Sequence, residues 1–389
     1  EVRKSAFHQY YAQYESHANT LAATLSGSNE RDAYAAKVRC HPSAVEAALF
    51  ADNVPLAVYD QLIAAVRAHL PIVHRYYELR RRLLGLDEIH HYDCYVPLVP
   101  ELEQRHTWDE AVQEITASLQ PLGTEYCDQL EAGLRGRWCD RYPNVGKQSG
   151  AFSSGTYDSD PYILMNFQED VIEHVFTLAH EAGHSMHTRL SADAQPFQYA
   201  GYTIFVAEVA STFNEQLLTR HLLSKAHSPK QRAAIISREI DAIRGTIIRQ
   251  TMFAEFERMS HSSVESGEPL TLEKIRTIYR ELLTAYFGSG FAIDEELELE
   301  SLRIPHFYRA FYVYKYATGL SASIALSKRV TEGGPKELAA YLQFLRGGCS
   351  KWPLDLLRDA GVDLETPEPV GLALTRFGEL VEELESLLG

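Results

Sequence analysis

Two histidines four residues apart, with a glutamate directly after the first, constrain this chain more than any other feature. His180, Glu181 and His184 lie in the segment His-Glu-Ala-Gly-His. On a helix, residues four apart lie one above the other on the same face, so both imidazoles can reach one metal ion. Glu181 then lies about 100° round the helix, where it can accept a proton from water that the metal acidifies. The spacing therefore predicts a helix that holds one zinc ion, the metal this pattern favours.

The flanking residues indicate both the extent of this helix and a third ligand. A helix is expected over residues 170–190, because an apolar run follows an acidic start. Catalytic zinc sites usually keep three protein ligands. Glu208 is a lone carboxylate in an apolar, small-residue helical pattern, where an unpaired charge is costly. Glu215, seven residues later and near the same face, is the competing candidate. We prefer Glu208 because its immediate neighbours are apolar or small.

Apolar periodicity predicts a mainly α-helical chain. The expected helices cover residues 7–25, 44–50, 55–70, 72–84, two segments of 108–135 broken near 121–123, 228–259, 271–286 and 370–388. Between residues 146 and 166, glycine, serine and tyrosine replace the helical pattern, which predicts a small β-element. An exposed strand edge in this element could hydrogen-bond the backbone of a bound peptide.

Composition narrows the classes of partner and the compartment. A net charge of −16 argues against nucleic acid and anionic membranes as partners. Apolar runs fall well short of 18 residues, so no membrane-spanning helix is predicted. The five cysteines are odd in number and widely spaced, which favours free thiols in a reducing compartment. We therefore expect a cytoplasmic protein; the sequence does not indicate an oligomeric state.

Beyond the histidine segment, the chain resembles the oligoendopeptidase F family of zinc metallopeptidases, which is related to thimet oligopeptidase and neurolysin. The resemblance is carried by residues 92–98, 149–155, 177–187, 205–211, 304–308 and 311–319. It implies one zinc ion on His180, His184 and Glu208, with Glu181 as general base and acid. It also implies a multi-helix catalytic domain of the zincin type, with the β-element beside the active-site cleft.

The resemblance further implies histidine and tyrosine donors that stabilise the negative charge on the reacting carbonyl oxygen. Residues 305–316 are rich in both, and Pro305 favours a helix start. On such a helix, Tyr312 and Tyr314 lie on different faces, so both cannot line one cleft. We expect His306 and Tyr314 to be the donors, with Tyr312 as the alternative.

The chain starts without an initiator methionine, close to the point where the resemblance begins. We therefore expect it to lack a further N-terminal region that whole family members carry. The chain itself is expected to form a single helical catalytic region. It comprises a helical part over residues 1–140, the β-element and zinc-ligand helices over 141–225, and a C-terminal helical part over 226–389.

These features together predict a zinc-dependent oligoendopeptidase that cuts internal bonds of short peptides. A zinc carboxypeptidase of similar fold could use the same ligands, but it would need a cation that holds the free carboxylate of the substrate. A catalytically incompetent peptide-binding zinc domain is the third possibility. Zinc content without hydrolysis of any peptide would favour that last interpretation.

Overall fold

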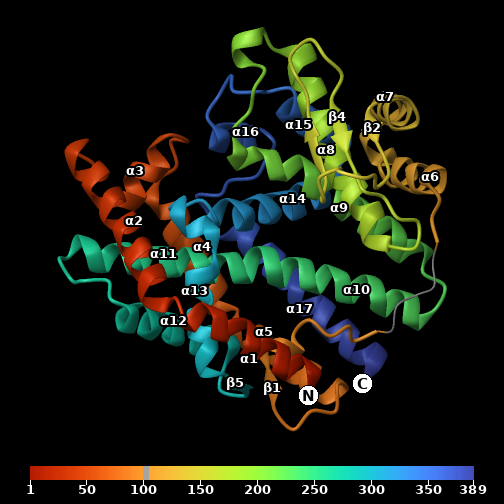
Figure 1. Ribbon diagram of the computed structural model, residues 1–389. Helices are drawn as coiled ribbons and strands as arrows, with labels where there is room; N and C mark the ends of the chain where they lie inside the picture. Colours follow the sequence, from red (N-terminus) through yellow and green to blue (C-terminus); the bar gives the residue numbers. More distant parts are fainter. Residues whose placement is uncertain (100–104) are drawn as a thin grey trace. The chain divides into compact units, whose positions relative to one another are not determined.

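The computed structural model describes residues 1–99 and 105–389, and helices account for most of them (Figure 1). Helix makes up 70% of the chain and strand 3%, which confirms the predicted mainly α class with small sheets. The chain separates into two compact units that interleave along the sequence. The first unit holds the described residues of 1–100, 240–317 and 374–389, and the second those of 101–239 and 318–373.

The first unit is built mainly of helices. They are α1 (Val2–Glu15), α2 (Ala18–Val38), α3 (Ala44–Phe50), α4 (Leu56–Ala68), α5 (Leu70–Leu83), α11 (Arg249–Glu265), α12 (Leu272–Phe287), α13 (Glu300–Arg303) and most of α17 (Glu368–Leu388). Two short parallel strands, β1 (Ile89–His90) and β5 (Phe291–Ala292), pair with each other. Helix α11 packs against α2, α4 and α12, and these contacts form the centre of the unit.

The second unit contains helices and a small sheet. Its helices are α6 (Trp108–Ser118), α7 (Thr124–Arg135), α8 (Ile172–Ala194), α9 (Ile204–Lys225), most of α10 (Pro229–Ile243), most of α14 (Tyr314–Glu332), α15 (Pro335–Leu345) and α16 (Pro353–Asp359). The strands are β2 (Cys139–Asp140), β3 (Phe152–Ser154) and β4 (Tyr162–Leu164), in the order β2-β4-β3. The β-element expected within residues 146–166 is therefore present.

The sheet places its edge strand against α8. Strand β3 is antiparallel to β4, with Ser153 opposite Ile163, while β2 is parallel to β4. The Ser153 hydroxyl hydrogen-bonds to that of Ser185 on α8 at 2.8 Å, and Ile163 is buried on the same face. Because side chains alternate along a strand, the residues on either side of Ser153 point to the opposite, open face.

Helices α8 and α9 pack tightly at Gly183. A Cβ atom built on Gly183 would lie 2.6 Å from both the Ala210 carbonyl oxygen and the Ser211 Cα atom. One turn away, the Asn214 amide donates to the Ala179 carbonyl at 3.1 Å, which joins the two helices a second time. Only a residue without a side chain allows this approach, so Gly183 sets the spacing between the helices.

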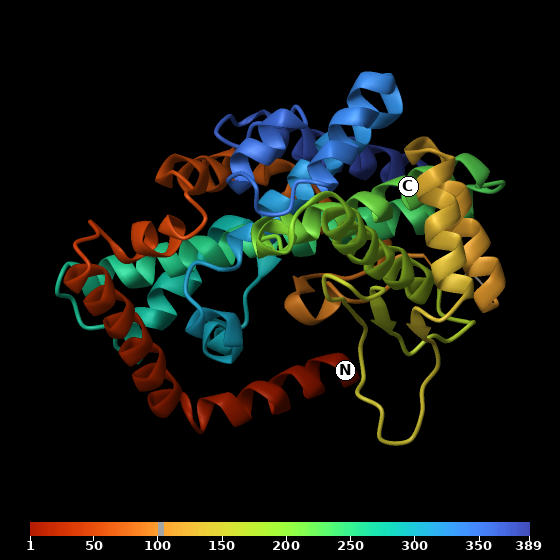
Figure 2. The same cartoon turned by 90° about the horizontal axis from the view of Figure 1, so that it is seen from above.

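Two expected helices are interrupted. The single helix expected over residues 7–25 is wrong, because the chain bends between α1 and α2, as Figure 2 shows. At the bend the Ser16 hydroxyl donates to the Gln13 carbonyl at 2.7 Å, and His17 leaves the helical conformation with φ −117° and ψ 6°. The helix expected over 228–259 continues from α10 to α11 through a π-helical turn, Arg244–Ile248.

The helix expected to begin at Pro305 is also wrong. A short 3₁₀ turn covers Pro305–Tyr308, and α14 begins only at Tyr314. Between them Phe311 has φ +57°, a left-handed conformation that a helix cannot include. Its backbone N–H donates to the buried Glu257 carboxylate at 2.7 Å, so this contact replaces a helical hydrogen bond.

Among the described residues, no single helix is both long and apolar enough to cross a membrane. Helices α4 and α5, which are bent by 47° relative to each other, meet that test only as a pair, by length and composition alone.

The close packing at Gly183 predicts a large effect of a single methyl group. Gly183→Ala should destabilise the protein by ~1–3 kcal/mol, because the new atom overlaps backbone atoms that cannot rotate away. Gly27→Ala, within α2, is the matched control, since nothing lies within 4 Å of a Cβ atom there. That change should stabilise by ~0.5–1 kcal/mol, because alanine favours helix. Thermal unfolding of both variants tests this, and equal unfolding temperatures would contradict it.

Candidate metal centre

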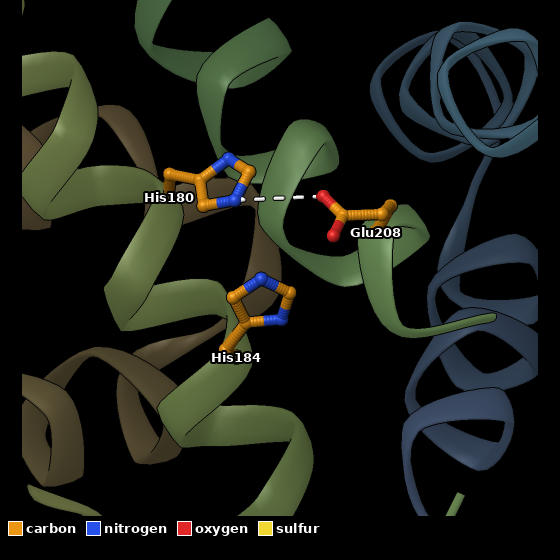
Figure 3. Close-up of side chains that lie close together, drawn as sticks. All are labelled: His180, His184 and Glu208. Carbon is orange, nitrogen blue, oxygen red and sulfur yellow. Dashed lines mark ion pairs between the residues drawn. The ribbon is translucent and has the colours of Figure 1, made fainter. Parts of the chain in front are cut away.

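His180, His184 and Glu208, which the sequence nominates as metal ligands, lie close together in the second unit (Figure 3). The two histidines come from α8 and Glu208 from the facing turn of α9. Their ligand atoms all lie within 4.8 Å of one another, and His180 Nε2 is 3.5 Å from Glu208 Oε2. Two imidazole nitrogens and one carboxylate oxygen are a ligand set that catalytic zinc sites use. The residues therefore fit a zinc ion.

Glu215, the competing ligand candidate, instead contacts the far side of the His180 ring. His180 Nδ1 hydrogen-bonds to Glu215 Oε1 at 2.8 Å, which leaves Nε2 on the side of Glu208. The other Glu215 oxygen accepts from Arg238 Nη2 at 3.0 Å. Burial raises the pKa of Glu215, but the contacts with His180 and Arg238 outweigh it and hold the pKa below its usual value. A carboxylate behind a ligand histidine fixes the ring orientation and makes the other nitrogen a better donor.

His184 is suited to donate a lone pair. Burial is the main cause that lowers its pKa to about 3, and the neighbouring His180 ring lowers it further. The imidazole is therefore neutral near pH 7, as a metal ligand must be. The rings of His180 and His184 are 4.8 Å apart and nearly perpendicular.

Glu181 lies between the ligand residues and the edge strand. Its carboxylate accepts a hydrogen bond from the Ser153 backbone N–H on β3. Burial raises the pKa of Glu181, and the charge of Glu208 raises it further, although His180 and the hydrogen bond act in the other direction. A buried carboxylate with a raised pKa beside a ligand cluster has the properties of a general base and acid.

Several residues without metal-binding atoms hold Glu208 in place. The Thr212 hydroxyl donates to the Glu208 backbone carbonyl at 2.5 Å, and it also contacts Ser323 on α14 at 2.8 Å. A Cβ atom on Gly319 would lie 3.3 Å from the Glu208 Cβ atom, so this glycine leaves room for the glutamate.

Tyr202, which sequence reasoning missed, supports the other end of the cluster. Its ring stacks on His187 with centroids 3.7 Å apart, and its hydroxyl donates to the His184 carbonyl at 3.4 Å. His187 is buried, and burial lowers its pKa to about 3, so it acts here as a neutral packing surface. Neither contact could be found from local periodicity, because Tyr202 lies outside the helices, 15 residues after His187 in the connection between α8 and α9.

The three candidate oxyanion donors all lie in the first unit but in different surroundings. His306 is exposed, and its ring is nearly parallel to that of Tyr312, with centroids 5.8 Å apart. Tyr314 is fully buried, and its ring packs against Tyr59 at 5.2 Å. Burial raises the pKa of Tyr314 well above its usual value. The surroundings thus separate an accessible pair, His306 and Tyr312, from a core residue.

Known proteins resemble the chain over its whole length. The oligopeptidase PepF of Bacillus subtilis is 47% identical over 388 residues, which are 100% of this chain and 58% of that protein. An oligoendopeptidase F homolog of Borreliella burgdorferi is 40% identical over 100% of this chain and 66% of its own length. The structure of oligoendopeptidase-F from Enterococcus faecium matches with a TM-score of 0.81 and 35% identity. That match covers 99% of this chain and 63% of the other.

The resemblance to oligoendopeptidase F that the sequence indicates is thus confirmed. The chain spans about three fifths of the length of the relatives it matches. A model of the family described as peptidase family M3 matches residues 1–375, which include the ligand cluster and the β-element. The chain therefore belongs to peptidase family M3.

Proposed function

We propose that this chain is the peptide-hydrolysing part of a zinc-dependent oligoendopeptidase. The observation that supports this most directly is the cluster of His180, His184 and Glu208, with ligand atoms within 4.8 Å and Glu181 beside them. The names of the relatives point to the same chemistry. Short peptides are the proposed substrates, and the cytoplasm is the proposed compartment.

His180, His184 and Glu208 would hold the metal. A zinc ion bound there supplies a Lewis acid that polarises a peptide carbonyl and makes water more acidic. Glu215 and Arg238 hold His180 in the orientation that this requires, because they fix its Nδ1 side.

Glu181 performs the proton transfers in this proposal. Its carboxylate takes a proton from the attacking water and then gives that proton to the leaving amine. The raised pKa favours the first step, because a more basic carboxylate takes a proton from water more readily. The Ser153 N–H fixes the carboxylate on the side of β3, where a substrate backbone would lie.

The free edge of β3 is the proposed binding surface for that backbone. Ile163 and Met165 direct their N–H groups away from β3, to the carbonyls of Trp138 and Asp140. Leu164 therefore pairs with Phe152 and Tyr162 with Ser154 within the sheet, and the backbone groups of Ser153 point outward, with its N–H toward Glu181. Main-chain pairing at such an edge binds peptides largely independently of their sequence, which suits an oligopeptidase.

His306 and Tyr312 are the proposed donors to the negative charge that develops on the carbonyl oxygen. A histidine N–H and a tyrosine hydroxyl can both supply such a hydrogen bond. We rank Tyr312 above Tyr314, the donor expected from the sequence, because Tyr314 is fully buried in its unit.

Mapping of cleavage sites on a mixed peptide library tests the class of activity. Cuts at internal bonds of short peptides, unaffected by amidation of the C-terminus, are expected of an oligoendopeptidase. Loss of turnover on amidation would instead identify a carboxypeptidase. Zinc content without any cleavage would identify a peptide-binding domain.

The proposed role of Glu181 predicts that its substitution lowers the activity without lowering the metal content. Glu181→Gln should retain zinc, because Glu181 is not a ligand, and should lower kcat by about 10²- to 10⁴-fold, because proton transfer is lost. Metal analysis and steady-state kinetics on the same preparation measure both quantities. Zinc loss together with activity loss would make Glu181 a ligand.

The roles of Glu208 and Glu215 predict a graded effect on metal affinity. Glu215→Ala should weaken zinc binding by about 10- to 100-fold, because the His180 ring is no longer oriented. Glu208→Ala should weaken it more, since a ligand is removed. Competition with a chelator measures both affinities. The reverse order would place Glu215 in the coordination shell and Glu208 behind it.

The different surroundings of the two tyrosines predict different defects. Tyr312→Phe should lower kcat and kcat/KM together, by about 100-fold, if the hydroxyl stabilises only the transition state. Tyr314→Phe should instead lower thermal stability and leave the activity per folded molecule nearly unchanged. His306→Ala should follow Tyr312→Phe. A catalytic defect confined to Tyr314→Phe would restore the assignment expected from the sequence.

A further inference from the structure

The open face of the β2-β4-β3 sheet carries two exposed aromatic side chains. Phe152 on β3 is 48% exposed, and Tyr162 on β4 is 52% exposed. Both point away from α8, because Ser153 between Phe152 and Ser154 points toward Ser185, and Ser154 pairs with Tyr162. Phe152 and Tyr162 are thus diagonal neighbours on one face, and Phe152 lies on the edge strand.

The position of Phe152 relative to Glu181 is fixed by one strand residue. The Ser153 N–H reaches the Glu181 carboxylate, so this point of the strand lies beside the proposed proton acceptor. A peptide strand that pairs with β3 places one side chain opposite Phe152, directly next to the residue opposite Ser153. Side chains opposite each other on neighbouring strands have Cβ atoms about 4.5–5.5 Å apart, so they touch.

We infer that Phe152 is a specificity-determining residue that favours peptides with a large apolar or aromatic side chain within roughly two residues of the cleaved bond. The inference rests on the proposed function, since it assumes that peptides pair with β3. Main-chain pairing alone would accept any sequence, and Phe152 adds a preference at one position.

The polar groups on this face are consistent with a bound peptide whose side chain at this position is apolar. Asp140 on β2 lies on the same face, since it pairs with Leu164, but its carboxylate is matched by Lys147 at 3.1 Å. Ser154 beside Phe152 is uncharged. Covering the ring of a half-exposed phenylalanine is favourable, because it removes apolar surface from water. A charged ligand side chain placed there would lose its contact with water without gaining a partner of opposite charge.

The test compares pairs of peptides that differ only by Phe or Ala at each position around the cleaved bond. For the wild-type chain, the ratio of kcat/KM values, Phe over Ala, should be about fivefold at one position. Phe152→Ala should bring this ratio close to one. Phe152→Leu should keep most of it, because leucine restores an apolar surface without the ring.

Phe50→Ala is the matched control. Phe50 and Phe197 are the most exposed phenylalanines on the described surface, at 71%, and Phe50 lies on α3 in the first unit, where its ring centroid is 5.2 Å from that of His41. Its removal should leave the ratio at the wild-type value. An unchanged ratio in Phe152→Ala, or an equal loss of activity on both peptides of a pair, would overturn the inference.

Affinities in the Glu181→Gln background separate this inference from the proposed function. There the same peptide pairs are compared by equilibrium binding, so turnover is not required. Wild-type cleavage with a Phe152-independent ratio would refute only the inference. A Phe152-dependent affinity ratio in a chain that cleaves no peptide would refute the proposed hydrolysis and retain the role of Phe152. Equal affinities in all variants would overturn the inference whether or not the chain is active.

Discussion

The contact between α8 and α9 at Gly183 is the constraint on which the metal centre depends. Both histidines lie on α8, but the third ligand candidate comes from α9, so the cluster exists only if the two backbones approach closely. Gly183 permits this because the Ala210 carbonyl and the Ser211 Cα atom occupy the space where a side chain would begin. The glycine within the His-Glu-Ala-Gly-His segment thus has a packing role, next to residues to which the proposed function assigns chemical roles.

Residues around this contact hold the ligand candidates through atoms that face away from the metal site. Glu215 and Arg238 fix the Nδ1 side of His180, while Gly319 and Thr212 leave room for Glu208 and anchor its backbone. Ser153 does the same for Glu181 from the edge strand. The side chains of His180 and Glu181 are therefore each held by a partner on another element, which keeps them in one orientation.

The sequence predicted those parts of the structure that depend on local periodicity. It did not predict conformations and contacts that depend on a residue far away in the chain. Helix α3 was expected over the residues that form it, and the break near 121–123 and a helix from residue 271 were expected as well. Glu208 could be nominated because a lone carboxylate in an apolar pattern is visible locally. The left-handed Phe311 could not be foreseen, because Glu257, which binds its N–H, lies 54 residues earlier. The same reason hid the role of Glu215, whose partner His180 lies 35 residues away.

The charges of the cluster explain why a divalent cation suits it better than protons do. Glu181, Glu208 and Glu215 lie on adjacent helices around two imidazoles, and Arg238 is the cation that pairs with Glu215. Burial raises the pKa of Glu181 and lowers that of His184, because it disfavours the charged form of both groups. The raised pKa of His180, despite its burial, reflects the surrounding carboxylates, which favour positive charge at that ring. A dication held by His180, His184 and Glu208 would balance the negative charge of these carboxylates, and in the proposed function Glu181 would remain available for proton transfer.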